Sequence, residues 1–487
     1  MKKISSLQSL GLLALGTLAL PSAEASDRPN VLFISIDDMR NTIGAYGDPI
    51  AITPNMDRLA REGRLFRSHY VQQPSCAPSR TSMLTGRRPD EIGVTNHATH
   101  FRDIHPDVVT LPQIFKLEGY QSVGIGKIFH YGRGYYDGIS WTVSVYDNNY
   151  GVDGHYVLPE NQAGGKAAAF ERVDVPDTAY LDGRYTDLAV DFLRKFRQER
   201  APFFLAVGYH KPHLPFNAPK RYWDLYDREA FYPIEQPDRP VDAPDIAFHN
   251  SNELRGYSDI PESGPVPREM AMELRHGYYA CVSYIDAQVG ILLDTLDQLR
   301  LRRNTIVVLW SDHGFHLGEQ AFWGKSSNFE LDARSPLIIS VPGMDTAGAA
   351  TDAFVESLDL YPTLIDLAGI EERTALSGRS LRPLLEDPAA EWGRTAFTQF
   401  GRPYRAAIGA REPLSHMGYS VRVPGWRFTA WLNVHTGEFE FPELYSLQDT
   451  HIESVNLAGR TEHAPIEAEL MEKIRAYSQT GKSRLLE

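Results

Sequence analysis

The chain has 487 residues, of which 42% are hydrophobic and 23% are charged, so it is long enough for one large hydrophobic core and a smaller appended lobe. Its formal net charge is −14 at pH 7, which makes it a poor general binder of nucleic acid, and we expect no nucleic-acid partner. An anionic substrate would have to be held by basic side chains gathered in a cleft.

Residues 1–25 have the pattern of a secretory signal peptide. Two lysines precede an apolar run from Leu10 to Leu20, and Ala23-Glu24-Ala25 provides a small-residue cleavage site. The run is shorter than the roughly 20 apolar residues that cross a bilayer, which disfavours a transmembrane anchor. We therefore expect no membrane span, and a mature chain that is periplasmic or secreted in a bacterium.

Short apolar runs rich in β-branched residues alternate with helical patterns along most of the chain. The expected strands are 31–36, 122–125, 203–207, 305–310 and 337–341, and the expected helices are 55–62, 111–117, 186–197 and 267–299. This alternation predicts an α/β sandwich around a large, mainly parallel sheet flanked by helices. In such sheets the ligand site lies at the carboxyl ends of the strands.

The pattern changes after about residue 390. Strand-like pieces at 420–423 and 428–432 are followed by a closing helix near 465–477. We expect an N-terminal catalytic domain at 26–390 and a smaller C-terminal subdomain with a short antiparallel sheet at 391–487. Residues 131–180, rich in glycine and tyrosine, and 210–266, rich in proline, are expected to form long ordered loops around the binding site.

The chain has two cysteines, Cys76 and Cys281. An even count in an exported protein permits a disulfide. Cys281, however, falls on the apolar face of the predicted helix 267–299, together with Tyr278 and Val282, which predicts a buried thiol. Cys76 is then left for other chemistry.

A cysteine lies directly before a predicted helix start in the stretch Cys76-Ala77-Pro78-Ser79-Arg80-Thr81-Ser82-Met83-Leu84-Thr85-Gly86. A helix start offers unpaired N–H groups and positive partial charge, which favour an anion at that point. The stretch resembles, at every fixed position, the C-x-P-S-R-x-x-x-L-T-G signature of the type I sulfatases. The similarity runs from Arg28 to Ala458 and is greatest to the iduronate-2-sulfatase branch of that family.

The resemblance implies a hydrolase of the alkaline phosphatase superfamily, with that superfamily's sandwich fold, which cleaves sulfate esters. It also implies that Cys76 is oxidised to formylglycine by a formylglycine-generating enzyme or an anaerobic sulfatase-maturing enzyme. One hydroxyl of the hydrated aldehyde would attack sulfur as a covalent nucleophile, and the other would then expel sulfate. Without the surrounding motif, a lone cysteine is more often a small buried hydrophobe.

Carboxylates at two predicted strand ends are candidate ligands of a hard cation. Asp37 and Asp38 end the first strand, and Asp312 and His313 follow a later one. An Asp pair after a strand is, by itself, more often a turn or a helix cap. Together with Cys76, the resemblance implies one Ca²⁺ per chain, with Mg²⁺ less favoured. Many family members have Asn in place of His313, although the iduronate-2-sulfatase branch shares the histidine.

Five further basic residues match family elements that bind sulfate and move protons. Arg80 and Lys127 would hold the formylglycine hydrate, and His130, three residues after Lys127, would take a proton from it. His213 or Lys325 would protonate the leaving alcohol. We favour His213, because a histidine can offer a proton near neutral pH.

The sequence leaves the sugar open, because rim loops decide substrate choice. The expected substrate is a 2-O-sulfated uronic acid or another sulfated polysaccharide fragment. Aromatic residues of the first loop can either stack on sugar rings or pack the rim, namely Tyr135, Tyr136, Trp141, Tyr146 and Tyr150. Two alternatives are a phosphomonoester or phosphonate monoester hydrolase of the same superfamily, which the complete cysteine motif disfavours, and a non-catalytic glycan binder with unconverted Cys76.

Overall fold

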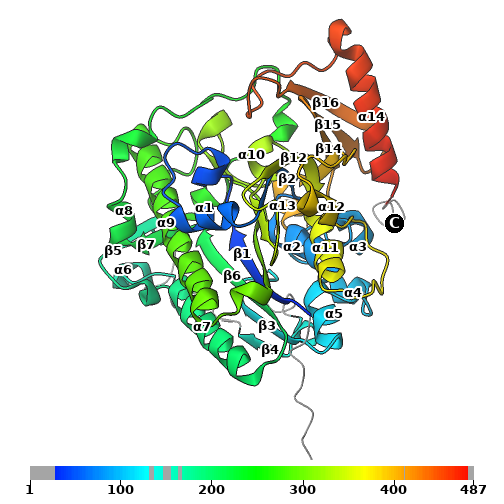
Figure 1. Ribbon diagram of the computed structural model, residues 1–487. Coiled ribbons are helices and arrows are strands. Elements are labelled where there is room, and N and C mark those ends of the chain that lie inside the picture. The colour runs from blue at the N-terminus through cyan, green and yellow to red at the C-terminus, as the bar shows by residue number, and fades with distance from the viewer. Residues whose placement is uncertain (1–27, 131–136, 146–154, 163–166, 411, 481–487) are drawn as a thin grey trace, which may run out of the picture.

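The computed structural model describes residues 28–130, 137–145, 155–162, 167–410 and 412–480. The predicted signal peptide and four of the loop aromatics, Tyr135, Tyr136, Tyr146 and Tyr150, lie outside these residues. Within them, a large sheet with helices on both sides is joined to a smaller sheet from the C-terminal part of the chain (Figure 1).

The large sheet has eight strands in the order β12-β2-β11-β8-β1-β6-β3-β4. Strand β1 pairs in parallel with β6 and β8, and β3 pairs in parallel with β6 and β4. Strand β11 runs antiparallel to both β8 and β2, so the sheet is mixed but mostly parallel. The strands are β1 Asn30–Asp37, β2 Arg64–Tyr70, β3 Gln121–Gly126, β4 Val143–Val145, β6 Phe203–Pro212, β8 Thr305–Ser311, β11 Leu337–Ser340 and β12 Ala350–Glu356.

Helices cover both faces of this sheet. Side chains of β1 alternate between two cores: Leu32, Ile34 and Ile36 pack with α1, α7 and α9, whereas Val31 and Phe33 pack with α2, α5 and α11. Burial on both faces explains why β1 is apolar without interruption. The helices are α1 Pro54–Arg61, α2 Cys76–Thr85, α5 Leu111–Leu117, α7 Leu181–Glu199, α9 Arg268–Gln298 and α11 Leu360–Leu367.

Shorter elements complete this part of the chain. Strand β5 (Phe170–Val173) pairs with β7 (Phe216–Pro219), and β9 (His316–Leu317) pairs with β10 (Trp323–Gly324). The short helices are α3 Pro89–Ile92, α4 Phe101–Ile104, α6 Pro159–Gln162, α8 Lys220–Trp223, α10 Glu330–Ala333, α12 Arg382–Glu386 and α13 Tyr404–Ala407.

The C-terminal part forms a four-stranded antiparallel sheet in chain order, β13 Ala396–Arg402, β14 His416–Val423, β15 Trp426–Asn433 and β16 Phe439–Ser446. Helix α14 (Ala464–Gln479) packs on it through Leu470, Ile474 and Tyr477. The sheet and helix lie at the upper right of Figure 1. The pieces predicted at 420–423, 428–432 and 465–477 fall inside β14, β15 and α14.

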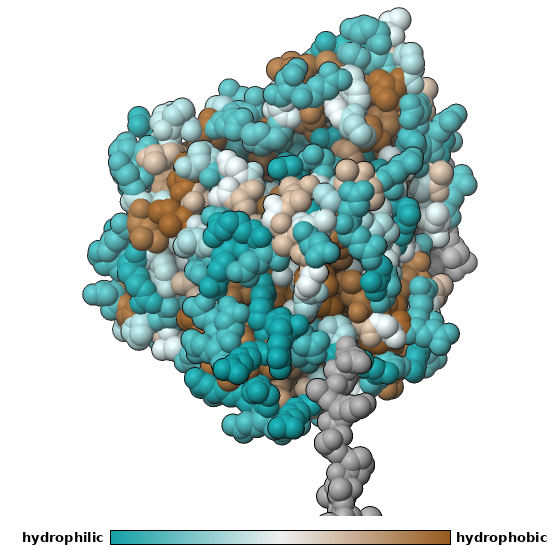
Figure 2. All heavy atoms as spheres, in the orientation of Figure 1, coloured by the Kyte–Doolittle hydropathy of each residue, from teal (hydrophilic) through white to brown (hydrophobic). Residues whose placement is uncertain are grey.

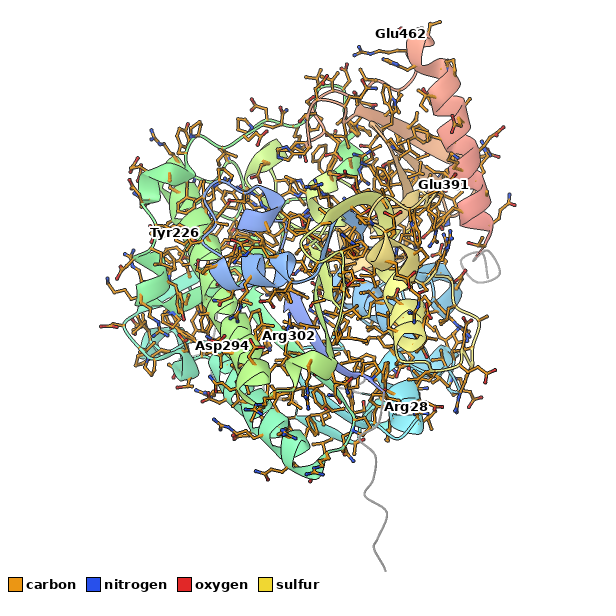
Figure 3. All side chains as sticks on the ribbon, in the orientation of Figure 1. Arg28, Tyr226, Asp294, Arg302, Glu391 and Glu462 are labelled. Atoms are coloured by element: carbon orange, nitrogen blue, oxygen red, sulfur yellow. The ribbon has the colours of Figure 1, made fainter. Side chains whose placement is uncertain are left out.

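The carboxyl ends of the parallel strands lie at one edge of the sheet. Strands β1 and β8 are parallel, with Ile36 opposite Ser311. Arg28 and Arg302, which precede the two strands, are both labelled in the lower half of Figure 3. This pairing brings Asp37 and Asp312, which directly follow Ile36 and Ser311, to the same place.

The predicted strands and helices are confirmed, with differences at their ends of up to about five residues. Three strands of the large sheet were not predicted from the sequence: β2 and β12 at one edge, and β4 at the other edge, within the expected loop 131–180. Strand β2 contains Arg64, Arg67 and His69, which break the apolar run. The sheet is mainly parallel, as predicted, and β11 is an exception. The connection from β8 to β11 contains no helix longer than one turn, whereas parallel neighbours are usually joined through an α-helix that packs on the sheet.

Cys281 is fully buried in α9 and donates to the carbonyl of Asn217 at 3.5 Å, so the prediction of a core thiol is confirmed. Both cysteines are free. Trp141 is also buried, with its ring against Gly124 and Phe129, so it packs the interior instead of offering a face to a sugar.

None of the helices in the described ranges has the length and apolar character needed to cross a membrane. The face drawn in Figure 2 is mostly hydrophilic, with scattered apolar patches, as expected when apolar side chains are buried between layers.

Candidate active site

Cys76 begins helix α2 at the carboxyl edge of the large sheet. The preceding residue, Ser75, is extended, and Gly86 ends the helix in a left-handed conformation with φ of 66°. Every residue of α2 is buried, and Cys76 is 1% exposed. The motif therefore holds its cysteine at the N-terminus of a rigid helix, where the helix dipole favours negative charge.

Asp38 turns the chain directly after β1. Its φ of 61° lies in the left-handed region, which Asp tolerates better than most residues. The backbone N–H of Asp38 donates to Oδ1 of Asp312 at 3.2 Å, which joins the two strand ends. Asp37, Asp38 and Asp312 are all fully buried.

Arg80, in the helix that begins at Cys76, links these strand ends. Its Nε donates to Asp312 Oδ2 at 2.8 Å, and one terminal nitrogen donates to Asp37 Oδ1 at 3.1 Å. The other terminal nitrogen donates to the carbonyl of Lys127 and to Ser35 Oγ. Burial alone would lower the pKa of Arg80, but the carboxylates of Asp312 and Asp37 raise it above its usual value. The guanidinium is therefore a permanent buried charge.

Lys127 comes from the end of β3 and faces the same carboxylate. Its Nζ forms an ion pair with Asp37 and lies 3.6 Å from Cys76 Sγ. Burial acts to raise the pKa of Asp37, but Lys127, His213 and Arg80 hold it well below its usual range. Asp37 is therefore ionised at the base of the site.

Nε2 of His313 faces Cys76 and two carboxylates. Its Nδ1 faces the carbonyl of Gly314 at 3.0 Å, so Nδ1 carries a hydrogen and donates there. Nε2 lies 3.3 Å from Cys76 Sγ, 3.4 Å from Asp38 Oδ1 and 3.6 Å from Asp312 Oδ2. Ligand atoms of Asp37, Asp38, Cys76 and His313 all lie within 4.8 Å of one another.

Two further basic side chains stand beside Asp38. Lys325 Nζ donates to both Asp38 oxygens at 2.7 and 2.8 Å. His213 places Nε2 at 3.9 Å from Asp38 Oδ2 and at 3.0 Å from Glu253 Oε1. Burial would lower the pKa of His213, but Asp38 and Glu253 raise it to about 10, so the ring is cationic near neutral pH.

A cavity of about 540 Å³ opens above this cluster. It is lined by Cys76, His97, His130, His213, Asn252, Glu253, Lys325, Ser326, Tyr404 and Ile408. His130 packs against His97 with ring centroids 4.4 Å apart, and His97 Nε2 lies 2.5 Å from Ser75 Oγ. Tyr404, from helix α13 of the C-terminal part, stacks on His249 at 4.2 Å.

The structure therefore gathers all the predicted site residues around Cys76. His97, Glu253 and Tyr404 also line the cavity and were not predicted from the sequence. Glu253 and His97 lie in connections between the large elements, and Tyr404 lies in a one-turn helix between two strands. No local motif marks any of the three.

Comparisons with known proteins agree with this geometry. A sequence model of the sulfatase family matches residues 29–370, and a model of the C-terminal region of N-sulphoglucosamine sulphohydrolase matches residues 318–480. The chain belongs to the sulfatase family. Iduronate 2-sulfatase of Mus musculus is 33% identical to this sulfatase over 528 residues, which cover 92% of this chain and 95% of the relative.

Two solved structures share the fold of this sulfatase. The structure of BT4656 in complex with its substrate D-glucosamine-2-N,6-O-disulfate has a TM-score of 0.74 and 23% identity, and covers 94% of this chain and 99% of that chain. Phosphonate monoester hydrolase from Silicibacter pomeroyi has a TM-score of 0.76 and 23% identity, with 94% and 97% covered. Both show the fold, whereas family membership makes this chain a sulfuric ester hydrolase.

Sulfatases generally use a formylglycine and a divalent metal, and the donor set of this sulfatase fits such a cation. Nε2 of His313 lies within 3.6 Å of the sulfur of Cys76 and of carboxylate oxygens of Asp38 and Asp312. A hard cation fits such a set, because carboxylate oxygens are its preferred ligands. The sulfur of the unmodified Cys76 marks the point from which an aldehyde oxygen would project.

Proposed function

We propose that this sulfatase removes sulfate from a carbohydrate, either a 2-O-sulfated uronic acid or another sulfated polysaccharide fragment. The observation that carries the proposal is the position of Cys76, at the base of a cavity that also exposes Lys325 and His213. Two cationic side chains beside the nucleophile can offset the charge of a sulfate ester, which would otherwise repel attack. The similarity to iduronate 2-sulfatase supports a carbohydrate ester.

Cys76 acts after a maturing enzyme, either a formylglycine-generating enzyme or an anaerobic sulfatase-maturing enzyme, has converted it to formylglycine. The hydrated aldehyde supplies a hydroxyl that attacks sulfur. Lys127, close to Sγ, and Arg80, through Asp37 and Asp312, hold this side chain in place. His130 receives the proton of the second hydroxyl when sulfate leaves; burial, with the charges of His97 and Lys127, holds its pKa well below its usual value, so the ring is neutral.

Asp37, Asp38, Asp312 and His313 would hold the metal, with residue 76 as a further ligand. We propose Ca²⁺, one per chain, because three carboxylates suit a hard cation that tolerates irregular geometry; Mg²⁺ is less favoured. When bound, the cation offsets negative charge on the sulfate oxygens. It also screens the three buried carboxylates from one another.

His213 protonates the departing alcohol. Its ring borders the cavity and is cationic near neutral pH, so it can donate. Lys325 is the competing donor. We assign Lys325 to sulfate binding, because its ammonium group borders the cavity and can offset the charge of a sulfate ester.

We also propose that residues 1–25 direct export to the periplasm or the exterior of a bacterial cell, and that the catalytic domain spans 26–390 and the C-terminal subdomain 391–487. The change from the large sheet to the antiparallel sheet between β12 and β13 supports this boundary. The C-terminal subdomain contributes Tyr404 and Ile408 to the cavity.

The test is sulfate release from 2-O-sulfated uronic acid disaccharides, assayed beside ulvan and carrageenan fragments and beside a phosphate and a phosphonate monoester. We expect turnover of at least one sulfated carbohydrate and none by the Cys76→Ala variant. Faster turnover of the phosphorus esters would favour the hydrolase alternative. Binding of a sulfated glycan without turnover, in protein from the native cell, would favour the non-catalytic alternative.

A further inference from the structure

Ser326 lines the cavity above Cys76 in an unfavourable backbone conformation. Its φ is 79°, in the left-handed region, and the residue is 2% exposed. A side chain at such a position crowds the following carbonyl oxygen, which costs stability that a glycine would not lose. Serine at this position therefore weakens the fold unless its side chain has another role.

Buried contacts around Ser326 impose this conformation. Its carbonyl accepts a hydrogen bond from a terminal nitrogen of Arg402 at 3.1 Å. The next residue, Ser327, donates through its backbone N–H to Oδ2 of Asp332 at 3.1 Å. The backbone is thus fixed at Ser326 and directly after it, as is usual where a strained conformation persists.

The hydroxyl of Ser326 is available to a ligand. It has no hydrogen-bond partner among the described residues, and its oxygen is not one of the unpartnered atoms that are closed off from solvent. Ser251 is also left-handed, with φ of 48°, but its hydroxyl accepts from the N–H of Trp323 at 3.0 Å. The side chain of Ser251 therefore has a partner inside the protein, whereas that of Ser326 faces the cavity that the residue lines.

The neighbouring lysine indicates the depth at which this hydroxyl lies. Lys325 extends its Nζ to both oxygens of Asp38, at the base of the cavity. The backbone that Lys325 shares with Ser326 is therefore about the length of a lysine side chain away from the base. A sulfate group beside Cys76 and Lys325 fills the base, so Ser326 lies at the level of the sugar.

We propose that Ser326 is a specificity-determining residue, whose hydroxyl forms a hydrogen bond with a hydroxyl of the sugar that carries the sulfate. The inference rests on the proposed function and concerns the same cavity. A serine hydroxyl both donates and accepts, so it matches a sugar hydroxyl in either direction. Because the residue is buried, a sugar without that hydroxyl leaves a polar group unpaired and binds less well.

The kinetic experiment compares Ser326→Ala and Ser326→Gly with the wild type on the sulfated disaccharide that the wild type turns over fastest. We expect both variants to lower kcat/KM by about 3- to 10-fold, mainly through KM, because one neutral hydrogen bond is lost. The Ki of inorganic sulfate should change by less than about 2-fold, because this product occupies the base of the cavity and has no sugar. Ala321→Gly, an exposed residue with φ of 55°, is the matched control and should leave both constants unchanged.

Melting temperatures separate a contact with the substrate from a structural role. Ser326→Gly removes the crowding at the left-handed position, so it should melt at the wild-type temperature or up to about 3 °C above it. Ser326→Ala loses only a hydroxyl that has no partner in the protein, so it should melt as the wild type does. Weaker use of the disaccharide would then accompany an unchanged or greater stability.

Three results would overturn the proposal. The first is a wild-type kcat/KM for the disaccharide in Ser326→Ala, and the second is a Ki for inorganic sulfate that rises together with KM. The third is a lower melting temperature in Ser326→Ala, since the hydroxyl would then have a partner inside the protein. A wild type that releases sulfate from no carbohydrate would instead overturn the proposed function, and this inference with it.

Discussion

Arg80 Nε donates to Asp312 Oδ2 at 2.8 Å, and this contact ties the helix that begins at Cys76 to the end of β8. Both side chains are fully buried. The same guanidinium reaches Asp37 at the end of β1, so one planar cation sets the spacing between the nucleophile and two of the proposed metal ligands. The arginine of the motif therefore holds Asp37 and Asp312 in place and is not part of the cavity lining.

Arg80→Lys should lower kcat/KM by at least about 100-fold. Lysine keeps the charge but cannot direct donors to Asp312, Asp37 and the Lys127 carbonyl together. Buried oxygens that lose their hydrogen-bond donor also cost about 1–3 kcal/mol, so the melting temperature should fall. Steady-state kinetics and thermal melting measure both effects, with the partly exposed Arg87→Lys as the matched control. If Arg80→Lys had the kcat/KM and the melting temperature of the wild type, the planar set of donors on the guanidinium would not be needed.

Removal of divalent metal by a chelator should abolish sulfate release and lower the melting temperature. The buried carboxylates would then repel one another, and a ligand that binds only the folded state stabilises it. Ca²⁺ should restore both properties at lower concentration than Mg²⁺. Elemental analysis of the active protein should give one divalent ion per chain.

His313→Ala should weaken Ca²⁺ binding in the same assay, whereas His451→Ala, at the exposed surface, should not. Full turnover by protein that elemental analysis shows to be metal-free would contradict the proposed donor set.

Tyr404→Ala should raise KM for a sulfated oligosaccharide by up to about 10-fold, with little change in kcat. The ring lines the cavity and is supported from behind by His249, and an aromatic stacking contact contributes about 0.5–1.5 kcal/mol. Tyr404→Phe keeps the ring and should bind as the wild type does. If the alanine and phenylalanine variants had the same KM, the ring would not contact the sugar.

Glu443→Gln should stabilise the protein above about pH 7. Glu443 is buried beside Trp431 and Tyr445, and burial raises its pKa from 4.5 to about 7. Because the folded pKa is the higher one, the stability that the protonated group contributes is complete below about pH 4.5. It is lost as the pH rises through 7.

The variant stays neutral, so its advantage in free energy of unfolding should be near zero at pH 4.5 and grow to about 1–3 kcal/mol above pH 7. Melting temperatures across this range measure the difference, with the exposed Glu438→Gln as the control. An advantage that does not change with pH would mean that Glu443 is already ionised.

The parts of the site that could be predicted from sequence are those fixed by local structure. Asp37, Asp38 and Asp312 follow apolar strands whose burial on both faces is visible in the sequence, and parallel strands must end at a common edge. Cys281 could be placed in the core because α9 is long and periodic.

Other features depend on contacts between distant segments. Glu253, His97 and Tyr404 reach the cavity from irregular connections or a single helical turn, and their positions are set by packing against residues far along the chain. The burial of Trp141 also depends on a distant residue. Gly124 has no side chain, which makes room for the Trp141 ring in the interior, and the composition of the loop did not indicate this.

The measurement that tests the account most directly is mass spectrometry of the peptide that contains Cys76, in protein from the native cell, together with sulfate release by the same preparations. The account predicts an aldehyde in place of the thiol, and a turnover that rises in proportion to the fraction of chains carrying it. Full turnover by chains in which Cys76 remains an intact thiol would contradict the central claim, because the nucleophile would then lie elsewhere.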